Sequence, residues 1–529
     1  MELLLNKTRL LFFQLSGGHC DSRQDNTVDA LNKNLRKPQH HFALANKEAM
    51  RSKHQAAQSI SKLCVKCKVH PPAVLLRVGD PYCRSCFNDY FIHKFRAMLG
   101  KNRVIFPGEK VLLAVSGGPS SCSMLHQVQE GLSVNAHKKL RFTPGIVFID
   151  EGALTGRSLE DRNKTNSELK ALFESTGLPF YIIPLEHVLE LPISVLIQPH
   201  VRSTESATSY KVAVAEFDQN NQSVAAQLPG QEQDPAAVSE VHTLKLQQLM
   251  ASVKTHTARD ELLCTLRQHL LLHTARSEGY SKLMLGDSCT RLAMKLLSNI
   301  SLGRGAQAAL DTGFSDSRYG DVIAVRPMRD YSAKEIAYYN HLFSVPSVFI
   351  PGLDFKTSDK DSIQRLTEGF VIKLQSEFPS TVSTIYRTSE KLQTACEAPT
   401  ALNDSPRCVL CLCALDTAAE NASAFQATMI SEQLSQKKSP QNDCLPTHKG
   451  STDKTQSSSA DCSGLCHGGS CCSNRLEPME LKTLLCYSCQ LTIKDMSSLE
   501  HMPNYIISET QRRLRRSQMK AEISNFLLD

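Results

Sequence analysis

The sequence predicts an α/β protein with a Rossmann-like parallel sheet, and three observations support this fold class. Short continuous apolar runs, such as 111–115 (VLLAV) and 145–150 (GIVFID), alternate with helical segments. Runs of this kind are buried strands of a parallel sheet that carries helices on both faces. A glycine turn follows the first strand, and paired cysteines flank the α/β region on both sides. We therefore expect this sheet to lie between an N-terminal zinc ribbon and a split C-terminal zinc-binding module.

Composition indicates a large globular chain from a reducing compartment. Its 529 residues are enough for roughly three or four domains. Hydrophobic residues make up 41%, charged residues 21%, and the formal charge is +7. The 19 cysteines are odd in number, and eight of them form four Cys-x-x-Cys pairs. This spacing favours metal ligation over a secreted disulfide scaffold.

Residues 1–60 read as a polar, disordered N-terminal extension. A short apolar stretch near the start is interrupted by Asn6, Lys7 and Arg9, and no convincing cleavage site follows it. We therefore expect no signal peptide. No apolar run reaches the length of about 18 residues that a membrane helix needs. The interpretation is a cytoplasmic protein with no membrane partner.

The α/β domain is expected over residues 104–395. A helix through Met124 and Val128 follows the glycine turn, and a Ser332–Glu335 capping box starts a later helix. An insertion or mobile loop rich in Ser, Gln and Asn interrupts the pattern at about 200–258. The remaining expected elements are helices at 158–177, 259–278 and 291–300, and strands at 145–150, 180–183, 282–285 and 322–325.

The first four paired cysteines predict a structural zinc site in a ribbon at 61–103. Cys64-x-x-Cys67 and Cys83-x-x-Cys86 enclose fifteen residues, so two knuckles can place four thiolates around one Zn²⁺. Gly79 and Pro81 suit the tight hairpin before the second pair. Four protein ligands leave no open coordination position, which favours a structural role. Coincidence or redox chemistry is the alternative interpretation.

A second site is predicted in a module at 396–495. Cys408-x-x-Cys411 and Cys486-x-x-Cys489 are separated by 74 residues, and the intervening 414–485 reads as a disordered insert. Closing so long a loop costs little more than closing a short one, because the entropy grows only logarithmically with length. Other cysteines compete as ligands: Cys413, Cys444, Cys462, Cys466, Cys471 and Cys472.

Positive charge gathers in two places that could contact nucleic acid. The candidates are Lys94, Arg96, Lys101 and Arg103 near the first cysteine site, and Arg512, Arg513, Arg515 and Arg516 in a basic C-terminal helix at 496–529. Clustered cations bind phosphate backbones. A solvated helix face is the alternative in each case. Phe87, Phe91 and Phe95 share one helix face and are predicted to be core rather than stacking platforms.

The glycine turn Ser116-Gly117-Gly118 has the setting of a phosphate-binding loop. Glycines let the backbone approach phosphate oxygens, and the helix N-terminus adds partial positive charge. A tight strand-to-helix turn is the alternative. The loop lacks both the Walker ending and the dinucleotide fingerprint.

This loop resembles that of the ATP pyrophosphatase superfamily, which reads Ser-Gly-Gly-x-Asp-Ser. Residues 147–151, Gly286-Asp287-Ser288 and the cysteine ribbon resemble its tRNA 2-thiolation branch. The stretches 93–110, 286–297 and 378–392 are similar to cytosolic tRNA 2-thiolation proteins, over about 64–392, 408–413 and from 486 onward. The resemblance implies an adenine nucleotide alpha-hydrolase-like fold and work on tRNA wobble uridine, toward 5-methoxycarbonylmethyl-2-thiouridine.

The chain departs from that branch at the positions that perform the chemistry. Pro119 and Ser120 stand where the pattern has a frequent lysine and the loop aspartate, so one backbone donor and one carboxylate are lost. Cys264 stands alone where the branch has a Cys-x-x-Cys. The later catalytic cysteine is expected near 345–350, yet no cysteine occurs between Cys289 and Cys396.

We therefore expect a non-catalytic partner subunit that helps to bind tRNA. The resemblance implies a heterodimer with a catalytic paralogue, a ubiquitin-related modifier as sulfur carrier, structural Zn²⁺, and ATP with Mg²⁺ at the partner. The loop then keeps a remnant of a nucleotide site: Ser116, Gly117, Gly118, Ser120, Ser121 and Asp287. Two alternatives stay open. Either the chain is itself a sulfurtransferase that uses Cys264 or Cys289, or it is a zinc-dependent RNA-binding scaffold without nucleotide.

Overall fold

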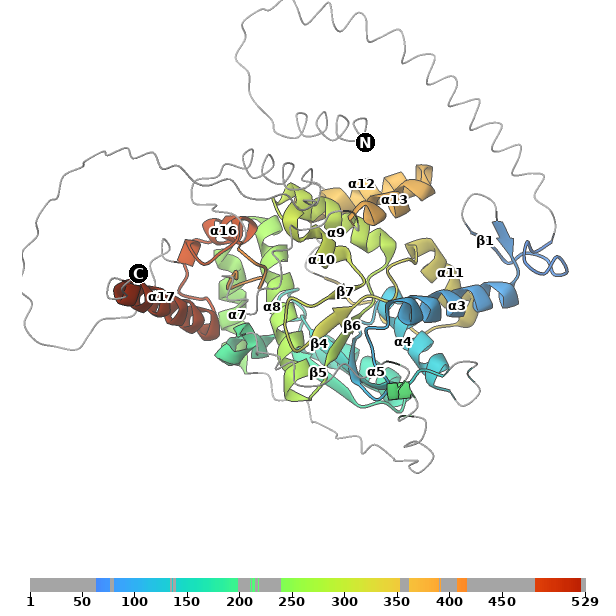
Figure 1. Cartoon of the computed structure of the whole chain (residues 1–529), viewed down its shortest axis with the longest axis horizontal. Helices are drawn as coiled ribbons and strands as arrows, with labels where there is room; N and C mark the ends of the chain where they lie inside the picture. The colour runs from blue at the N-terminus through green and yellow to red at the C-terminus, as the bar shows by residue number, and fades with distance from the viewer. Residues whose placement is uncertain are drawn as a thin grey trace, which may run out of the picture. The chain divides into compact units, whose positions relative to one another are not determined.

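The computed structural model describes residues 63–76, 80–133, 136, 139–197, 210, 212–214, 217, 239–352, 361–389, 391, 407–415 and 481–524 (Figure 1). The expected extension at 1–60 and most of the expected insert at 414–485 lie outside these residues. The chain forms two compact units. The described residues of Met1–Leu75 and Gly79–Cys83 belong to one unit, and those of Leu76–Val78 and Arg84–Asp529 belong to the other.

A short hairpin joins the first two cysteine pairs along the chain. Strand β1 (Val74–Leu76) pairs with β2 (Asp80–Tyr82) in a two-stranded sheet. Ala73 N donates a hydrogen bond of 2.8 Å to Tyr82 O, and Val65 N donates one of 2.8 Å to Pro81 O. The hairpin therefore brings the segment of the first pair back to the start of the second.

The larger unit is built on a six-stranded sheet with the order β5-β4-β3-β6-β8-β7. All neighbouring strands are parallel except β7, which runs antiparallel to β8. This confirms the predicted parallel α/β sheet. The strands are β3 (Lys110–Ala114), β4 (Thr143–Asp150), β5 (Phe180–Pro184), β6 (Lys282–Leu285), β7 (Ser315–Asp316) and β8 (Ile323–Val325).

The strand order reverses between β3 and β6. The chain passes from β3 outward to β4 and β5, and then returns to pair β6 with the other edge of β3. In open α/β sheets, ligands bind outside the carboxyl ends of the strands at such a switch point. A ligand site is therefore expected at the loops that follow β3 and β6.

Helices and short 3-10 turns connect the strands and surround the sheet (Figure 1). The helices are α3 (Arg84–Asn102), α4 (Pro119–Leu132), α5 (Leu159–Glu174), α7 (Glu240–Ser252), α8 (His256–Ser277), α9 (Cys289–Ser301), α10 (Ala308–Thr312), α11 (Ala333–Phe343), α12 (Ile363–Glu377), α13 (Pro379–Ser389), α16 (Tyr487–Lys494) and α17 (Asn504–Ser524). The 3-10 turns are η2 (Leu185–Glu190), η3 (Ile193–Leu196) and η4 (Gly305–Gln307).

One hydrophobic core connects the sheet to the C-terminal segments. It joins Leu112 of β3 and Leu283 of β6 to Leu266 of α8, and continues to Leu410 and Cys489. Segments that are far apart in sequence are thus parts of one core. The C-terminal cysteine region is integrated into the α/β domain.

Helix α3 packs against α11 through aromatic side chains. Phe87, Phe91 and Phe95 are fully buried, as the sequence predicted. The ring of Phe91 stacks on Tyr339 with 3.9 Å between centroids and 8° between planes. The predicted capping box of α11 is present, with Ser332 and Glu335 each binding the other's backbone N–H.

Helix α7 occupies part of the expected insertion at 200–258. Its buried residues Leu246, Leu249 and Met250 recur at a spacing of three and four, which gives the helix one apolar face. The polar composition of the whole range hid this local pattern. Within the described part of the chain, every helix is too short or too polar to cross a membrane.

Candidate functional site

The glycine loop follows β3 at the switch point of the sheet. Gly117 has φ = +77°, and a Cβ there would lie 3.1 Å from Ile350 Cδ1, so both conformation and space require glycine. Gly118 is the N-cap of α4 and Pro119 begins the helix. The prolyl nitrogen carries no hydrogen, so this position offers no donor to a phosphate.

The loop also packs tightly against the turn after β6. A Cβ on Gly286 would lie 2.9 Å from Ser121 Cα, and the Ser120 hydroxyl donates to Gly286 O. Ser121 Oγ lies 3.1 Å from Gly118 O and accepts from Ser116 N at 3.2 Å. The hydroxyl groups of Ser120 and Ser121 are thus bound to the protein's own backbone.

A distant segment lies over the loop. Val348 N donates a 2.9 Å hydrogen bond to Gly117 O, and Ile350 contacts Gly117. This is the segment in which the family pattern places its later cysteine. In this chain Val348 is the residue at the point of contact.

Asp287 after β6 faces arginines. Its carboxylate lies 3.4 Å from Arg326 Nε and 3.9 Å from Arg291 Nε. Arg326 is nearly fully buried. A guanidinium at this position opposes a divalent cation at the same carboxylate, because like charges repel.

The structure separates the two candidate thiols by environment. Cys264 is exposed on α8, one turn before Arg267, which is paired with Glu151. Cys289 is buried at the start of α9. Burial is the main cause that raises the pKa of Cys289 to about 12. This is the opposite of the lowered pKa that an activated helix N-terminal thiol would have.

One cysteine at the loop was not singled out from the sequence. Cys122 lies in the first turn of α4, and its Sγ is 3.2 Å from Gly117 O. Burial raises its pKa to about 12, which keeps the thiol protonated. The sequence could have indicated this position, because Cys122 is three residues after Pro119 and the first turn of the helix must face the loop.

The first four cysteines come together in space. The Sγ atoms of Cys64, Cys67, Cys83 and Cys86 lie within 4.8 Å of one another, and the Cys67–Cys83 separation is 3.9 Å. A tetrahedral site with Zn–S bonds of about 2.3 Å has sulfur–sulfur edges of about 3.8 Å. The donor set therefore fits a tetrahedral metal.

Backbone donors favour the thiolate form in this cluster. Burial would raise the pKa of Cys64, but hydrogen bonds from the backbone of Cys67, Cys83 and Lys66 outweigh it and lower the pKa to about 6. The thiolate is the form that ligates metal. The cluster is therefore suited to a metal before one binds.

The second four cysteines form a matching cluster. The Sγ atoms of Cys408, Cys411, Cys486 and Cys489 lie within 4.8 Å of one another, with Cys411 and Cys486 3.6 Å apart. Cys413 is not part of this group. It lies beside Arg318, with its Sγ 2.9 Å from Arg318 Nη1.

Both clusters use the same local geometry. Lys68 N donates to Cys64 O at 2.8 Å, and Leu412 N donates to Cys408 O at 3.0 Å. Lys68 and Leu412 both adopt positive φ, 56° and 59°. The second pair of each cluster is at the start of a helix, α3 or α16, and not in a further knuckle as the sequence suggested.

A buried arginine accompanies the second cluster. Arg304 Nη2 lies 3.6 Å from Cys489 Sγ, and Nη1 is paired with Glu261 of α8 at 2.5 Å. Burial would lower the pKa of Arg304, but Glu261 and the cluster sulfurs raise it well above its ordinary value. The guanidinium stays cationic and offsets the negative charge of the thiolates.

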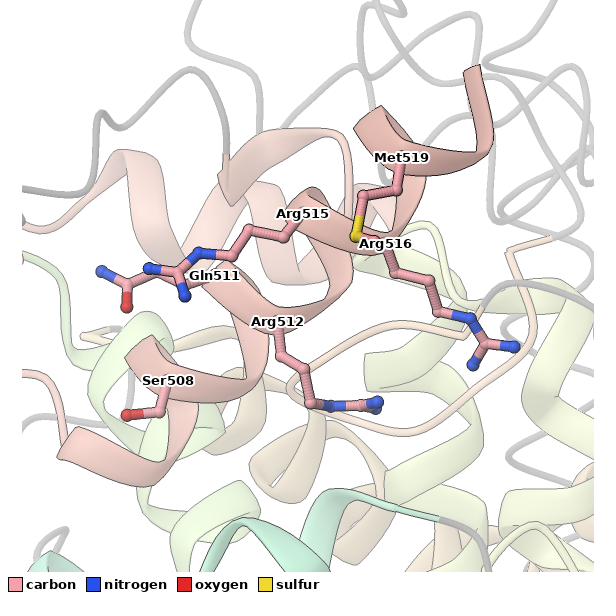
Figure 2. Close-up of a pocket in the computed structure, with 6 residues that line it drawn as sticks. All are labelled: Ser508, Gln511, Arg512, Arg515, Arg516 and Met519. Carbon is pink, nitrogen blue, oxygen red and sulfur yellow. The ribbon is translucent and has the colours of Figure 1, made fainter. Parts of the chain in front are cut away.

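The basic candidates differ in their surroundings. Lys94 forms an ion pair of 2.9 Å with Glu335, and its ammonium lies 4.5 Å over the Tyr331 ring. Both partners are largely buried, so this cation holds α3 to α11. Arg96 is half-buried, while Lys101 and Arg103 are exposed. In α17, Arg512, Arg515 and Arg516 line a shallow hollow (Figure 2).

Comparisons with known proteins agree on one family. The model of the family "Cytoplasmic tRNA 2-thiolation protein 2" matches residues 362–491. A Danio rerio protein of that name is 56% identical over 485 residues, which cover 89% of this chain and 95% of the relative. The Homo sapiens protein is 49% identical over 486 residues, covering 88% and 93%.

A solved structure was also found to be similar. It is the U34-tRNA thiolase NcsA from Methanococcus maripaludis with its [4Fe-4S] cluster, at 16% identity and a TM-score of 0.44. The match covers 65% of this chain and 93% of the other.

Proposed function

Because this chain belongs to the cytoplasmic tRNA 2-thiolation protein 2 family, we propose that it acts in the cytoplasm in the 2-thiolation of tRNA wobble uridine. The reaction would supply the 2-thio group of 5-methoxycarbonylmethyl-2-thiouridine. The chain acts as the partner subunit of a catalytic adenylating sulfurtransferase and helps to bind tRNA.

The switch-point loop is the observation that carries the non-catalytic role. The loop keeps its glycines and its place after β3, but Pro119 removes a donor and Ser120 replaces a carboxylate. Its hydroxyl groups bind Gly286 O and Gly118 O, and Val348 lies in the cysteine-free segment 345–350, where the resemblance places a reactive cysteine. These contacts support a stabilised remnant of a nucleotide site.

The proposed cofactors follow from this division of labour. The two cysteine clusters hold structural Zn²⁺, since each supplies four thiolates and leaves no ligand position open. ATP and Mg²⁺ bind at the catalytic paralogue, with which this chain forms a heterodimer. A ubiquitin-related modifier delivers the sulfur to that subunit.

The first alternative makes this chain the sulfurtransferase. The burial and raised pKa of Cys289 weigh against it, since the nucleophile must be a thiolate. Cys264 is accessible on α8, whereas the groups that contact the loop are Asn340, Val348 and the protonated thiol of Cys122. The second alternative is a scaffold without nucleotide anywhere in the complex. Calorimetric measurement of ATP binding tests it.

The test uses this chain purified alone and purified in complex with its catalytic paralogue. We expect Cys264→Ser and Cys289→Ala, introduced separately in this chain, to leave the yield of 2-thiouridine in tRNA unchanged. Serine in the corresponding cysteines of the paralogue is the matched control and should abolish the yield. ATP binding by calorimetry should be seen with the complex and the lone paralogue.

Two outcomes would overturn the proposal. One is full-rate thiolation by the lone chain supplied with ATP and a sulfur donor. The other is loss of 2-thiouridine with Cys264→Ser while the variant still binds its partner and tRNA. A complex that thiolates tRNA without any ATP binding would favour the scaffold.

A further inference from the structure

Helix α17 has two halves with different surroundings. In the first half, Tyr505, Ile506, Glu509 and Thr510 are buried in the core. From Gln511 to Ile523 the side chains are exposed or half-buried. Between 511 and 524 the sequence carries five Arg or Lys residues and one acidic residue, Glu522. The projecting half is thus strongly positive.

Arg513 is directed inward and fixes the helix. Its Nη1 donates to Arg407 O at 2.5 Å, its Nη2 donates to Leu196 O at 3.2 Å, and its Nε pairs with Glu509 at 2.6 Å. Glu509 has no exposed side-chain surface. This arginine therefore anchors the helix and is not available to a ligand.

The outward face of the helix presents three other arginines. Arg512, Arg515 and Arg516 line a shallow hollow together with Ser508, Gln511 and Met519, and Figure 2 shows their side chains extending from α17. Positions separated by three, four and seven residues lie on one side of a helix. Arg512 keeps 45% of its side chain exposed although it pairs with Glu509.

The second cysteine cluster holds this helix at two points. Arg407, which accepts from Arg513, directly precedes Cys408. Tyr505 Oη lies 2.7 Å from His269 Nδ1, and His269 Nε2 lies 2.7 Å from Leu410 O, inside the Cys408–Cys411 knuckle. The position of the arginine face thus depends on the conformation of the knuckle.

We propose that the face of α17 defined by Arg512, Arg515 and Arg516 binds the phosphate backbone of tRNA, and that the second cysteine cluster holds it in place. The inference rests on the proposed function and names the surface that serves it. Guanidinium groups present planar, paired donors that match phosphate oxygens. Met519 is the sole apolar side chain among the six that line the hollow, whereas protein interfaces usually need aromatic or aliphatic anchors.

The main experiment measures tRNA affinity of the whole complex as a function of salt. For Arg515→Ala with Arg516→Ala, we expect the slope of log K against log salt to lose about 1 to 2 units in magnitude, since each phosphate contact contributes about 0.7 to 0.9. Lys245→Ala with Lys373→Ala removes the same charge from exposed positions on α7 and α12 and should not change the slope.

A second arm tests the link to the cysteine cluster. Cys411→Ser should lower tRNA affinity by about as much as the arginine variant, and the triple variant should bind no more weakly than either, with metal content measured in parallel. If Cys411→Ser does not fold, Arg513→Leu removes the anchor without touching the outer face. It should lower the affinity while leaving metal content unchanged.

The outcomes separate this inference from the proposed function. An unchanged salt slope in a complex that still thiolates tRNA overturns the inference alone. Loss of the catalytic subunit from the complex on arginine replacement also overturns it, because the face would then bind protein. Normal tRNA thiolation in cells that lack this chain overturns the proposed function instead.

Discussion

The two cysteine clusters share a local design but differ in what surrounds them. In each, the first cysteine pair sits in a knuckle that ends on a residue of positive φ, and the second pair starts a helix. Around the first cluster, Leu63, Val65 and Val69 are exposed. Around the second, Val409, Leu410 and Leu412 belong to the main hydrophobic core.

The two sites therefore differ in which parts of the sequence bring their four cysteines together. Fifteen residues and a hairpin bring the first four thiolates together. The second four come from segments 74 residues apart, and Val409 N binds Leu484 O at 3.0 Å within the core. The first cluster can be assembled locally, whereas the second is assembled by the α/β domain and in turn stabilises it.

Replacing one cysteine ligand in each cluster should give the largest difference in stability between the two clusters. We expect Cys411→Ser to lower the free energy of unfolding of the main domain by at least about 3 kcal/mol, because structural zinc contributes about 10 to 16 kcal/mol in small domains. Cys67→Ser should release one metal and leave the main transition unchanged. Calorimetry with metal analysis measures both, and equal losses would contradict the distinction.

A pH effect of intermediate size should come from His269, which lies beside the second cluster. Burial lowers the pKa of His269 to about 4 from an ordinary value of 6.5. Between these values the unfolded state binds more protons, so stability falls as the pH falls from 6.5 to 4, by up to about 3 kcal/mol.

Replacement of His269 by glutamine should flatten this dependence. His70→Gln, at an exposed position beside the first cluster, is the matched histidine control. Denaturant unfolding at several pH values provides the measurement. A slope that persists unchanged in His269→Gln would assign the acid sensitivity to other groups.

The smallest expected effect lies in the two knuckle residues of positive φ. Left-handed backbone costs a non-glycine residue about 1 kcal/mol, so Lys68→Gly should stabilise the first module by up to about that amount. Leu412→Gly gains the same relief but loses a buried side chain, for a net destabilisation of about 1 to 3 kcal/mol. The unfolding temperatures of the two variants should shift in opposite directions.

The sequence predicted most features that depend on local patterns. Strands such as β6, the capping box at Ser332 and the buried face of Phe87, Phe91 and Phe95 follow from periodicity and side-chain type. The first cysteine cluster follows from spacing. Each of these depends on residues that are close together in the chain.

Features set by tertiary contacts could not be predicted in this way. Lys94 reads as a surface cation until Glu335, 241 residues away, appears beside it. The approach of Val348 to Gly117 and of Arg326 to Asp287 likewise depends on how the chain returns to the switch point. Composition also hid α7, because its apolar positions are few within a polar range.

The second cluster also determines where this polypeptide can tolerate a break. Its two halves, at 408–411 and 486–489, are each fixed by the core and by shared thiolates, and 74 residues of chain connect them. Doubling the length of such a connection costs only about 0.6 kcal/mol. The stretch between them is therefore a natural position for a split protein, in which two separately encoded fragments reassemble and a bound metal reports that they have done so.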